Sequence, residues 1–236
     1  MRSPFLLFFA LCCTILEGAP LAPAPDVIVE NYQTASREAE HSLRGASMQV
    51  EIQADLPKLK KHGRLRALRH ISSLGRISYD ALRWEGDNTI KNSVIARYLE
   101  AEAQAQTDQG PSLAVTPANY KFKYKGIRQA ETGAVHVFRV APHKKRAGLF
   151  NGEVWIDGRT FLPVRMSGRL VKNPSIFLKT VEFVRTFEIR NGMAVPRQIQ
   201  SVVDTRLVGK AELVVDFTEY SQSENSSAGL LDSSGQ

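Results

Sequence analysis

The sequence predicts a mainly β protein with two or more helices (α+β), built on a strongly curved antiparallel sheet or open half-barrel. A series of apolar, β-prone runs occupies the chain after Asn119, and turn signals such as Asp157-Gly158 and Asn191-Gly192 separate them. Several of these runs exceed ten residues, and long strands in sequential hairpins favour a sheet that curves. Stretches with helical spacing come earlier in the chain and supply the helices.

Residues 1–24 have the properties of a secretory signal peptide. Arg2 precedes the apolar run Phe5–Leu16, and small and proline residues follow between Gly18 and Pro25. The run is too short to span a bilayer as a stable helix, so we predict that it directs export to the periplasm. An uncleaved membrane anchor is the alternative for the same run.

Both cysteines, Cys12 and Cys13, lie inside this apolar run. A lipid-anchored form would use one of them, although Phe9-Ala10-Leu11 is a poor approach to a lipidation site. If the signal is removed, the remaining chain has no cysteine, and disulfide and thiolate chemistry are excluded for it.

The first element of the exported chain is predicted to be a helix over Val27–Arg44. Apolar residues recur there at three- and four-residue steps, with Asp26 as the expected N-cap and Gly45 as the expected stop. The spacing then changes to period two from Met48 to Leu56, which predicts a strand with one wet face.

Two further strands and a second helix are predicted next. A basic turn over residues 58–63 leads to strands over Leu65–Ser72 and Arg76–Trp84. Apolar spacing and an alanine-rich end indicate a helix over Asp87–Gln106, followed by a loop over Thr107–Pro117.

The chain beyond Asn119 is predicted to be strand after strand. The expected strands are Tyr120–Arg128, Val135–Ala141, Gly148–Ile156, Thr160–Val171, Phe177–Arg190, Ala194–Leu207 and Lys210–Tyr220. The serine-rich segment Ser221–Gln236 has no periodicity and is predicted to be a disordered tail. The expected organisation is therefore a signal peptide (1–24), one folded domain (25–220) and a tail (221–236).

No group of residues has the spacing that catalysis or metal binding requires. The pairs His62/His70 and His136/His143 are too far apart along extended chain to hold one ion. No Gly-x-Ser-x-Gly elbow and no phosphate-cradling glycine motif occurs, and the strand carboxylates have no distinctive pairing. We therefore predict no catalytic residue, no metal and no cofactor, and a protein that is not an enzyme. A hydrolase of envelope polymers stays as a further alternative.

The face pattern of the strands is the more useful signal. From Phe177 to Ile189 the odd positions are apolar, except for Lys179 and Arg185. A sheet that curves around such a face, with helices on its concave side, can leave an apolar cavity with Arg185 at its wall. The alternative is that the helices fill the concavity and Arg185 reaches outward to solvent.

The chain is basic, with a formal net charge of +7 at pH 7. Such a surface is attracted to anionic lipid head groups, acidic polymers or nucleic acid. Export makes nucleic acid the poorest of these partners, and an anionic membrane surface and acidic polymers stay as candidate partners. A basic surface that serves solubility alone is the alternative.

The strand–turn–strand Val154–Arg165 resembles a recurring hairpin of the LolA-like superfamily of outer-membrane lipoprotein-sorting proteins, in which an Asp-led turn precedes a "Leu-Pro-Val-Arg"-like strand. Ile90–Glu102 is similar to a segment of uncharacterised bacterial members. The resemblance covers about residues 26–220 and includes the order of signal, helix, strands, helical insert and long strands. The strands of this chain carry more Arg and Lys than a minimal carrier, and no functional arginine of the carriers matches one of Arg64, Arg66, Arg69 and Arg185 uniquely.

The resemblance implies an open half-barrel that holds an apolar ligand without covalent chemistry. We accordingly expect a monomeric carrier or binding protein for lipid acyl chains or a lipoprotein, and the alternative is an envelope protein-binding or sensing module without bound lipid. The predicted ligand-binding residues are Val50, Ile52, Trp84, Trp155, Val164, Met166, Val181, Phe183, Arg185 and Phe187.

Overall fold

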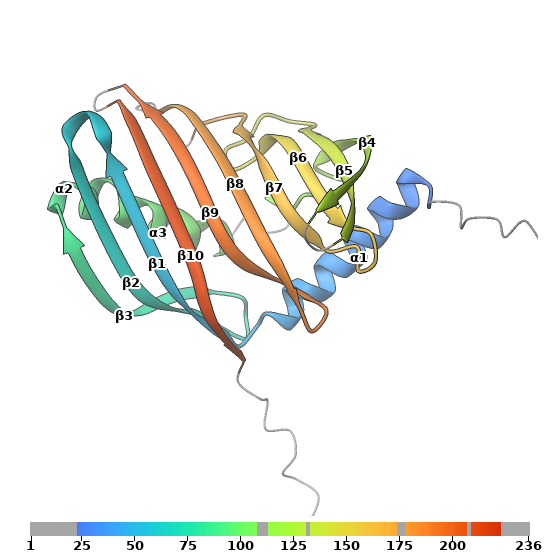
Figure 1. Ribbon diagram of the computed structural model, residues 1–236, viewed down its shortest axis with the longest axis horizontal. Helices are drawn as coiled ribbons and strands as arrows, with labels where there is room; N and C mark the ends of the chain where they lie inside the picture. Colours follow the sequence, from blue (N-terminus) through green and yellow to red (C-terminus); the bar gives the residue numbers. More distant parts are fainter. Residues whose placement is uncertain (1–22, 108–112, 131–132, 174–177, 207–208, 223–236) are drawn as a thin grey trace, which may run out of the picture.

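The computed structural model describes residues 23–107, 113–130, 133–173, 178–206 and 209–222. Within these ranges the chain forms one antiparallel sheet of ten strands in the order β3-β2-β1-β10-β9-β8-β7-β6-β5-β4 (Figure 1). The strands are β1 (Ala46–Leu56), β2 (Lys61–Ile71), β3 (Ile77–Gly86), β4 (Tyr120–Ala130), β5 (Gly133–Pro142), β6 (Phe150–Asp157), β7 (Pro163–Leu170), β8 (Leu178–Arg190), β9 (Met193–Thr205) and β10 (Lys210–Gln222).

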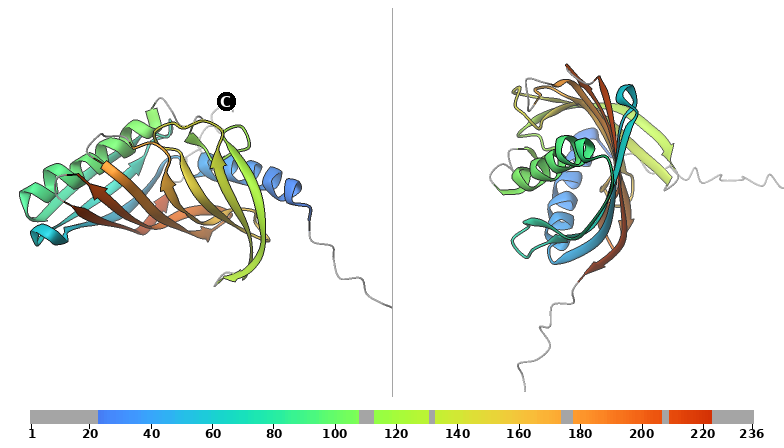
Figure 2. Two further views of the ribbon diagram at one scale, coloured as in Figure 1. Left: turned by 90° about the horizontal axis from the view of Figure 1, so that it is seen from above. Right: turned by 90° about the vertical axis from the view of Figure 1, so that its left-hand side faces the viewer.

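Two helical units lie on the concave side of this sheet. The first is α1 (Pro25–Ser42), and the second runs through α2 (Asn88–Ile90), a π-helical turn (Lys91–Ile95) and α3 (Ala96–Thr107). Figure 2 shows both units inside the curve of the sheet, and Figure 1 looks at the opposite, convex face. In the part of the chain that is described, β3 and β4 each pair on one side only, so the sheet stays open. The predicted half-barrel with helices on its concave side is confirmed.

The connectivity is a series of hairpins with one exception. Strand β10, the last in sequence, does not extend an edge but lies between β1 and β9, with Val50 opposite Phe217 and Val215 opposite Ile199. This insertion joins the three strands that precede the second helical unit to the seven that follow it. Both helical units therefore face one continuous floor.

Helix and strand ends differ from the predictions for local reasons. Helix α1 begins at Pro25, because proline fits a first helical turn, and Asp26 consequently lies in that turn and not at the N-cap. Strand β2 begins at Lys61, inside the predicted basic turn, because Pro57–Leu59 and the left-handed Lys60 reverse the chain in fewer residues. The second helix begins as predicted, with the Asp87 side chain accepting from the Thr89 backbone N–H.

The predicted signal peptide and the predicted tail lie mainly outside the described residues. Residues 1–22 and 223–236 are not described, and of the predicted tail only its first two residues are, as the end of β10. Residues 108–112 of the predicted loop are likewise outside the described ranges.

Strands β6 and β7 approach each other unusually closely at one point. Gly152 pairs directly with Gly168, and an added Cβ at Gly152 would lie 1.9 Å from the Ser167 carbonyl oxygen. An added Cβ at Gly168 would lie 2.7 Å from Cδ2 of Phe150. Glycine at both positions gives Phe150 and Phe183 room to meet edge to face on the concave side, with ring centroids 5.0 Å apart.

Candidate functional site

The concave face carries two separately covered apolar clusters. The first lies under the α2–α3 unit, where Ile90 and Ile95 pack on β1, β2, β9 and β10. The second lies under the first half of α1, where Ile28 and Tyr32 pack on β4, β5 and β6. The second half of α1 covers the ends of β8 and β9 through Ala39. Strand register places the middle of β7 and β8 between the two main clusters.

Three of the predicted ligand-binding residues lie beneath the α2–α3 unit. Val50 and Ile52 are 2% and 0% exposed, so the helical unit fills this part of the concavity. Trp84 on β3 is half-buried against the same cluster, with Lys91 Nζ 6.0 Å from its ring centroid. Any ligand that reached Val50 or Ile52 would first have to displace the helix.

A second set of predicted residues lies together on the middle of the floor. Met166, Val181 and Phe183 are half-buried, and Arg185 is exposed beside them. Their strand partners place all four on the concave face: Met166 opposite Arg185, Phe183 opposite Gly168, and Val181 opposite Val203. Phe187 continues this strand and packs near Leu162 and Ala194 under α1.

The remaining two predicted residues do not join this group. Trp155 pairs with Val137 and Arg165, and this register places it on the convex face. Its neighbour Val154 points to the concave face. Val164 lies at a register shift between β6 and β7 and packs with Val135 and Val137. Two cations lie over the Trp155 ring, with Arg128 Cζ 5.4 Å and Arg165 Cζ 5.0 Å from a ring centroid.

An ion pair that the sequence patterns did not single out connects α3 to the sheet. Arg69 of β2 is 6% exposed, and its Nη2 donates to Glu102 Oε1 of α3 at 3.0 Å. The Tyr79 hydroxyl donates to the other oxygen of the same carboxylate. The guanidinium also lies 5.8 Å from the Phe217 ring centroid. Arg69 occupies an otherwise apolar face after Leu65 and Ala67, and that interruption is the signal that could have identified it.

The phenols around this ion pair stay protonated. Burial, and then the nearby Glu102 charge, raise the pKa of Tyr79 well above its usual value. The pKa of Tyr98 is raised by the same two causes, while the positive charge of Arg185 acts in the opposite direction. Both hydroxyls therefore serve as donors, and the pairing of Arg185 with Ile199 places Arg185 on the helix side of the sheet.

The described ranges hold no candidate metal site and no candidate membrane-spanning helix. Their His, Cys, Asp and Glu side chains form no group of three or more that could hold a metal ion. No helix within those ranges is long and apolar enough to cross a membrane.

A buried histidine lies at the other end of the concave face. His136 is 5% exposed, its Nδ1 lies 3.2 Å from the Tyr124 hydroxyl, and the buried Asp157 is close by. Burial lowers the pKa of His136 below its usual 6.5, and the charge of Asp157 opposes the shift. Asp157 itself stabilises the β6–β7 turn by accepting from the Arg159 and Thr160 backbone N–H groups.

This lowered pKa predicts a loss of stability in mild acid. Below about pH 6.5 His136 is protonated in the unfolded chain, whereas burial keeps it neutral to lower pH in the folded protein. The free energy of unfolding therefore decreases as the pH falls below about 6.5. Replacing His136 by Gln should make the decrease between pH 8 and pH 5 smaller, because the glutamine side chain does not titrate. Urea unfolding at both pH values measures it, with exposed His62→Gln as the control. An unchanged pH dependence in His136→Gln would contradict the assignment.

Comparisons with known proteins find similarity at the level of solved structures. No protein-family model matches the chain, and no curated protein matches it. The chain is similar to LolA superfamily protein NE2245 from Nitrosomonas europaea, at 11% identity and a TM-score of 0.41 over 82% of this chain and 94% of that one. A DUF1329 family protein from Desulfovibrio piger matches at 11% identity and a TM-score of 0.43, over 84% and 94% of the two chains.

A putative outer membrane lipoprotein-sorting protein domain from Vibrio parahaemolyticus matches as well. Its identity is 12% and its TM-score 0.44, over 84% of this chain and 92% of that one. The matched structures thus include the superfamily that the hairpin Val154–Arg165 resembles. At these identities the likeness concerns the fold.

Proposed function

We propose that the protein is an exported, non-enzymatic carrier or binding protein that holds an apolar, acyl-type ligand or a lipid-modified partner on its concave face. The observation that carries the proposal is the middle of the floor on β7 and β8, where Met166 and Phe183 pack against the cluster under α1 and stay partly exposed. Met166, Val181 and Phe183 are apolar side chains that the helices leave only half-buried. Covering such side chains with an acyl chain contributes about 0.8 kcal/mol for each methylene removed from water.

Arg185 gives the proposed site its polarity. Its exposed guanidinium lies on the floor among apolar neighbours, directly opposite Met166 on β7 and Ile199 on β9. A cation in that position suits the anionic or carbonyl end of a ligand whose acyl part covers Val181 and Phe183. Binding of this kind needs no covalent step, and the proposal assigns none. The periplasmic location belongs to the same proposal and rests on residues 1–24.

Dye and lipid binding to the purified protein test the proposal. Native mass spectrometry of protein prepared from envelope extract should reveal a co-purifying lipid, and a fluorescent apolar dye should bind and be displaced by a fatty acid. Val181→Asp should weaken dye binding at least tenfold, because it places a charge on the floor. Val184→Asp is the matched control, since Val184 lies on the same strand but faces the convex side.

A second variant covers the case in which Val181→Asp fails to fold. Val181→Trp fills the floor with apolar volume and should also reduce dye binding, while circular dichroism reports an intact sheet. Equal dye binding by wild type, Val181→Trp and Val184→Asp, with no lipid in the mass spectrum, would overturn the proposal.

An envelope module that binds a partner protein without lipid is the alternative. Its supporting observation is edge strand β3, which pairs with β2 alone among the described strands and exposes 59% of Leu82. Such an edge can accept a strand of another chain. A stoichiometric protein partner in pull-down, together with absence of bound lipid, would favour this function.

A further inference from the structure

Charge is divided unevenly over the convex face of the sheet. Strand register identifies the side chains that point away from the helices, because directly paired residues share a face. On β4 to β7 those side chains are mainly cationic: Lys121, Lys123, Arg128, Arg139, Arg165 and Arg169. Register places two acidic residues among them within the described parts of these strands, Glu153 and the buried Asp157. These six cations are called the basic half below.

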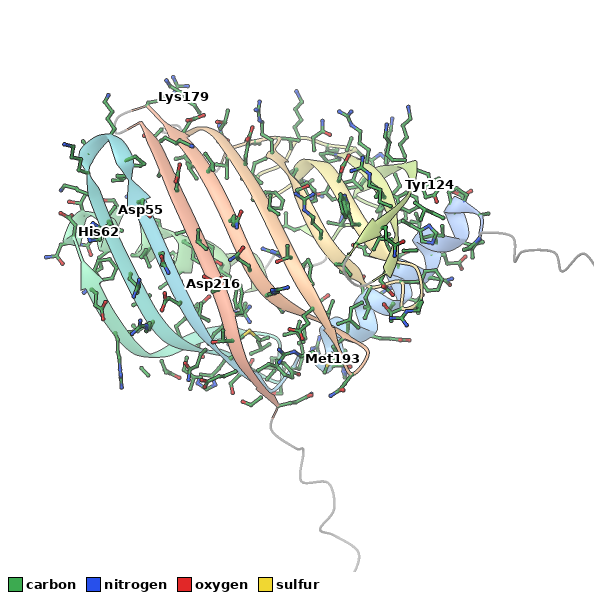
Figure 3. The ribbon with its side chains drawn as sticks, in the orientation of Figure 1. Asp55, His62, Tyr124, Lys179, Met193 and Asp216 are labelled. Carbon is green, nitrogen blue, oxygen red and sulfur yellow. The ribbon has the colours of Figure 1, made fainter. Side chains whose placement is uncertain are left out.

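The neighbouring strands β1, β8, β9 and β10 carry the opposite charge. Their convex side chains include Glu51, Asp55, Glu182, Asp204, Glu212 and Asp216. Figure 3 labels Asp55 and Asp216 on this part of the sheet. The nearby cations Arg64 and Arg66 of β2 are both paired with Glu51. The net basic charge of the chain is thus not spread evenly over this face.

Most cations of the basic half are available to a partner. No ion pair is recorded for Lys121, Lys123 or Arg139 in the described part of the chain, and all three are exposed. Arg169 is the exception, because it pairs with Glu182 at the border between the two halves. Cations on an edge strand also discourage aggregation, but Arg139 and Arg169 are on inner strands, where that role does not apply.

A shallow groove lies within the basic half. Its volume is about 510 Å³, and its lining includes the cations Arg139, Lys145 and Arg169, the carboxylate Glu153, and the apolar Leu170 and Val171. Cations beside apolar side chains match the junction between a phosphate head group and its glycerol ester. Trp155, half-buried beside Arg128 and Arg165, adds the kind of aromatic side chain that is enriched at membrane interfaces.

We propose that the basic half docks the protein on the surface of an anionic phospholipid bilayer, with a lipid head group in the groove beside Arg139. The cations cover an area four strands wide, and a bilayer surface can contact such an area as a whole, whereas a linear polyanion follows a stripe. This inference does not depend on whether the concave face holds a ligand. Docking through the convex face leaves the helices and the floor that they flank free.

Vesicle co-sedimentation tests the inference. The purified protein should bind phosphatidylglycerol-containing vesicles and not pure phosphatidylcholine vesicles, with affinity that falls as salt rises. The triple variant Lys121→Gln/Lys123→Gln/Arg139→Gln should bind the anionic vesicles roughly 100-fold more weakly, since each cation near such a surface contributes about fivefold. All three side chains are exposed, so the fold should be retained, which circular dichroism checks.

The matched control removes the same charge from the other end of the convex face. Arg64→Gln/Arg66→Gln/Arg83→Gln lowers the net charge equally and should change vesicle affinity less than threefold. Equal losses in both triple variants would show a net-charge effect alone and overturn the inference, as would absence of binding by the wild-type protein. Heparin binding that the first variant loses, with vesicle binding unchanged, would assign the surface to an acidic polymer instead.

Discussion

Replacing Glu102 by Gln should lower the free energy of unfolding by about 3 kcal/mol, because it leaves the Arg69 guanidinium buried without a counter-charge. Arg69 is 6% exposed, and its Nε has no hydrogen-bond partner among the described residues. The Glu102 carboxylate is therefore its main compensation. Chemical denaturation monitored by tryptophan fluorescence measures the change.

The same ion pair allows two sharp controls. Glu182→Gln breaks the ion pair between Glu182 and Arg169, in which the Arg169 side chain is 61% exposed and the Glu182 side chain 52%. Because this pair is exposed, its loss should cost at most about 1 kcal/mol. The double variant Arg69→Met/Glu102→Leu removes both buried charges and should recover most of the loss. A cost for Glu102→Gln no larger than that for Glu182→Gln would show that the buried pair is not a main attachment of α3.

Weakening this attachment also bears on the proposed ligand site. Arg69 and Tyr79 are the sheet residues that hold the Glu102 carboxylate of α3. Loss of that carboxylate should loosen the helix that covers Val50 and Ile52, so an apolar dye should enter faster. If α3 only completes the core and does not control access to it, Glu102→Gln should lower the stability without changing the rate of dye entry.

Replacing Gly152 by Val should prevent normal folding or cost about 3 kcal/mol or more. The first carbon of the new side chain would lie 1.9 Å from the Ser167 carbonyl oxygen and 2.6 Å from the Gly168 Cα, both of them backbone atoms of the paired strand. Backbone in the middle of a sheet cannot move aside without breaking its ladder of hydrogen bonds. Soluble yield and the urea midpoint measure the effect.

Gly75→Ala provides the comparison for this prediction. Gly75 has a φ of +79°, and no atom of the described residues lies within 4 Å of an added Cβ, so alanine there meets backbone strain without a clash. We expect a cost of about 1 to 2 kcal/mol and normal soluble expression. If Gly152→Val were as mild as Gly75→Ala, the close approach of β6 and β7 would be wrong.

The sheet and its faces could be predicted because period-two spacing is a local property. Val50 and Ile52 alternate with polar residues, and the structure buries both. Trp155 shows the limit of this reasoning. Its apolar character alone did not say which face it occupies, because that depends on its register with Val137 and Arg165 on neighbouring strands.

The features that the sequence patterns did not predict depend on contacts between residues far apart in the chain. Arg69 and Glu102 are far apart in sequence and meet only because α3 lies across the sheet. The convex charge division has the same origin, since Lys123 and Arg139 become neighbours through strand pairing and not through spacing. The place of β10 between β1 and β9 likewise follows from no local signal.

That insertion has a consequence for how the chain acquires its structure. The sheet consists of two sequential hairpin arrays, and β10 is the seam that joins them, with Ala46 opposite Gln222 across most of the chain length. Contacts of such sequence separation form late and slowly. A chain emerging from a ribosome or a translocation pore therefore carries two unsealed β-edges, on β1 and β9, until its final strand arrives. Its period of greatest vulnerability to aggregation ends only with the last folded residues.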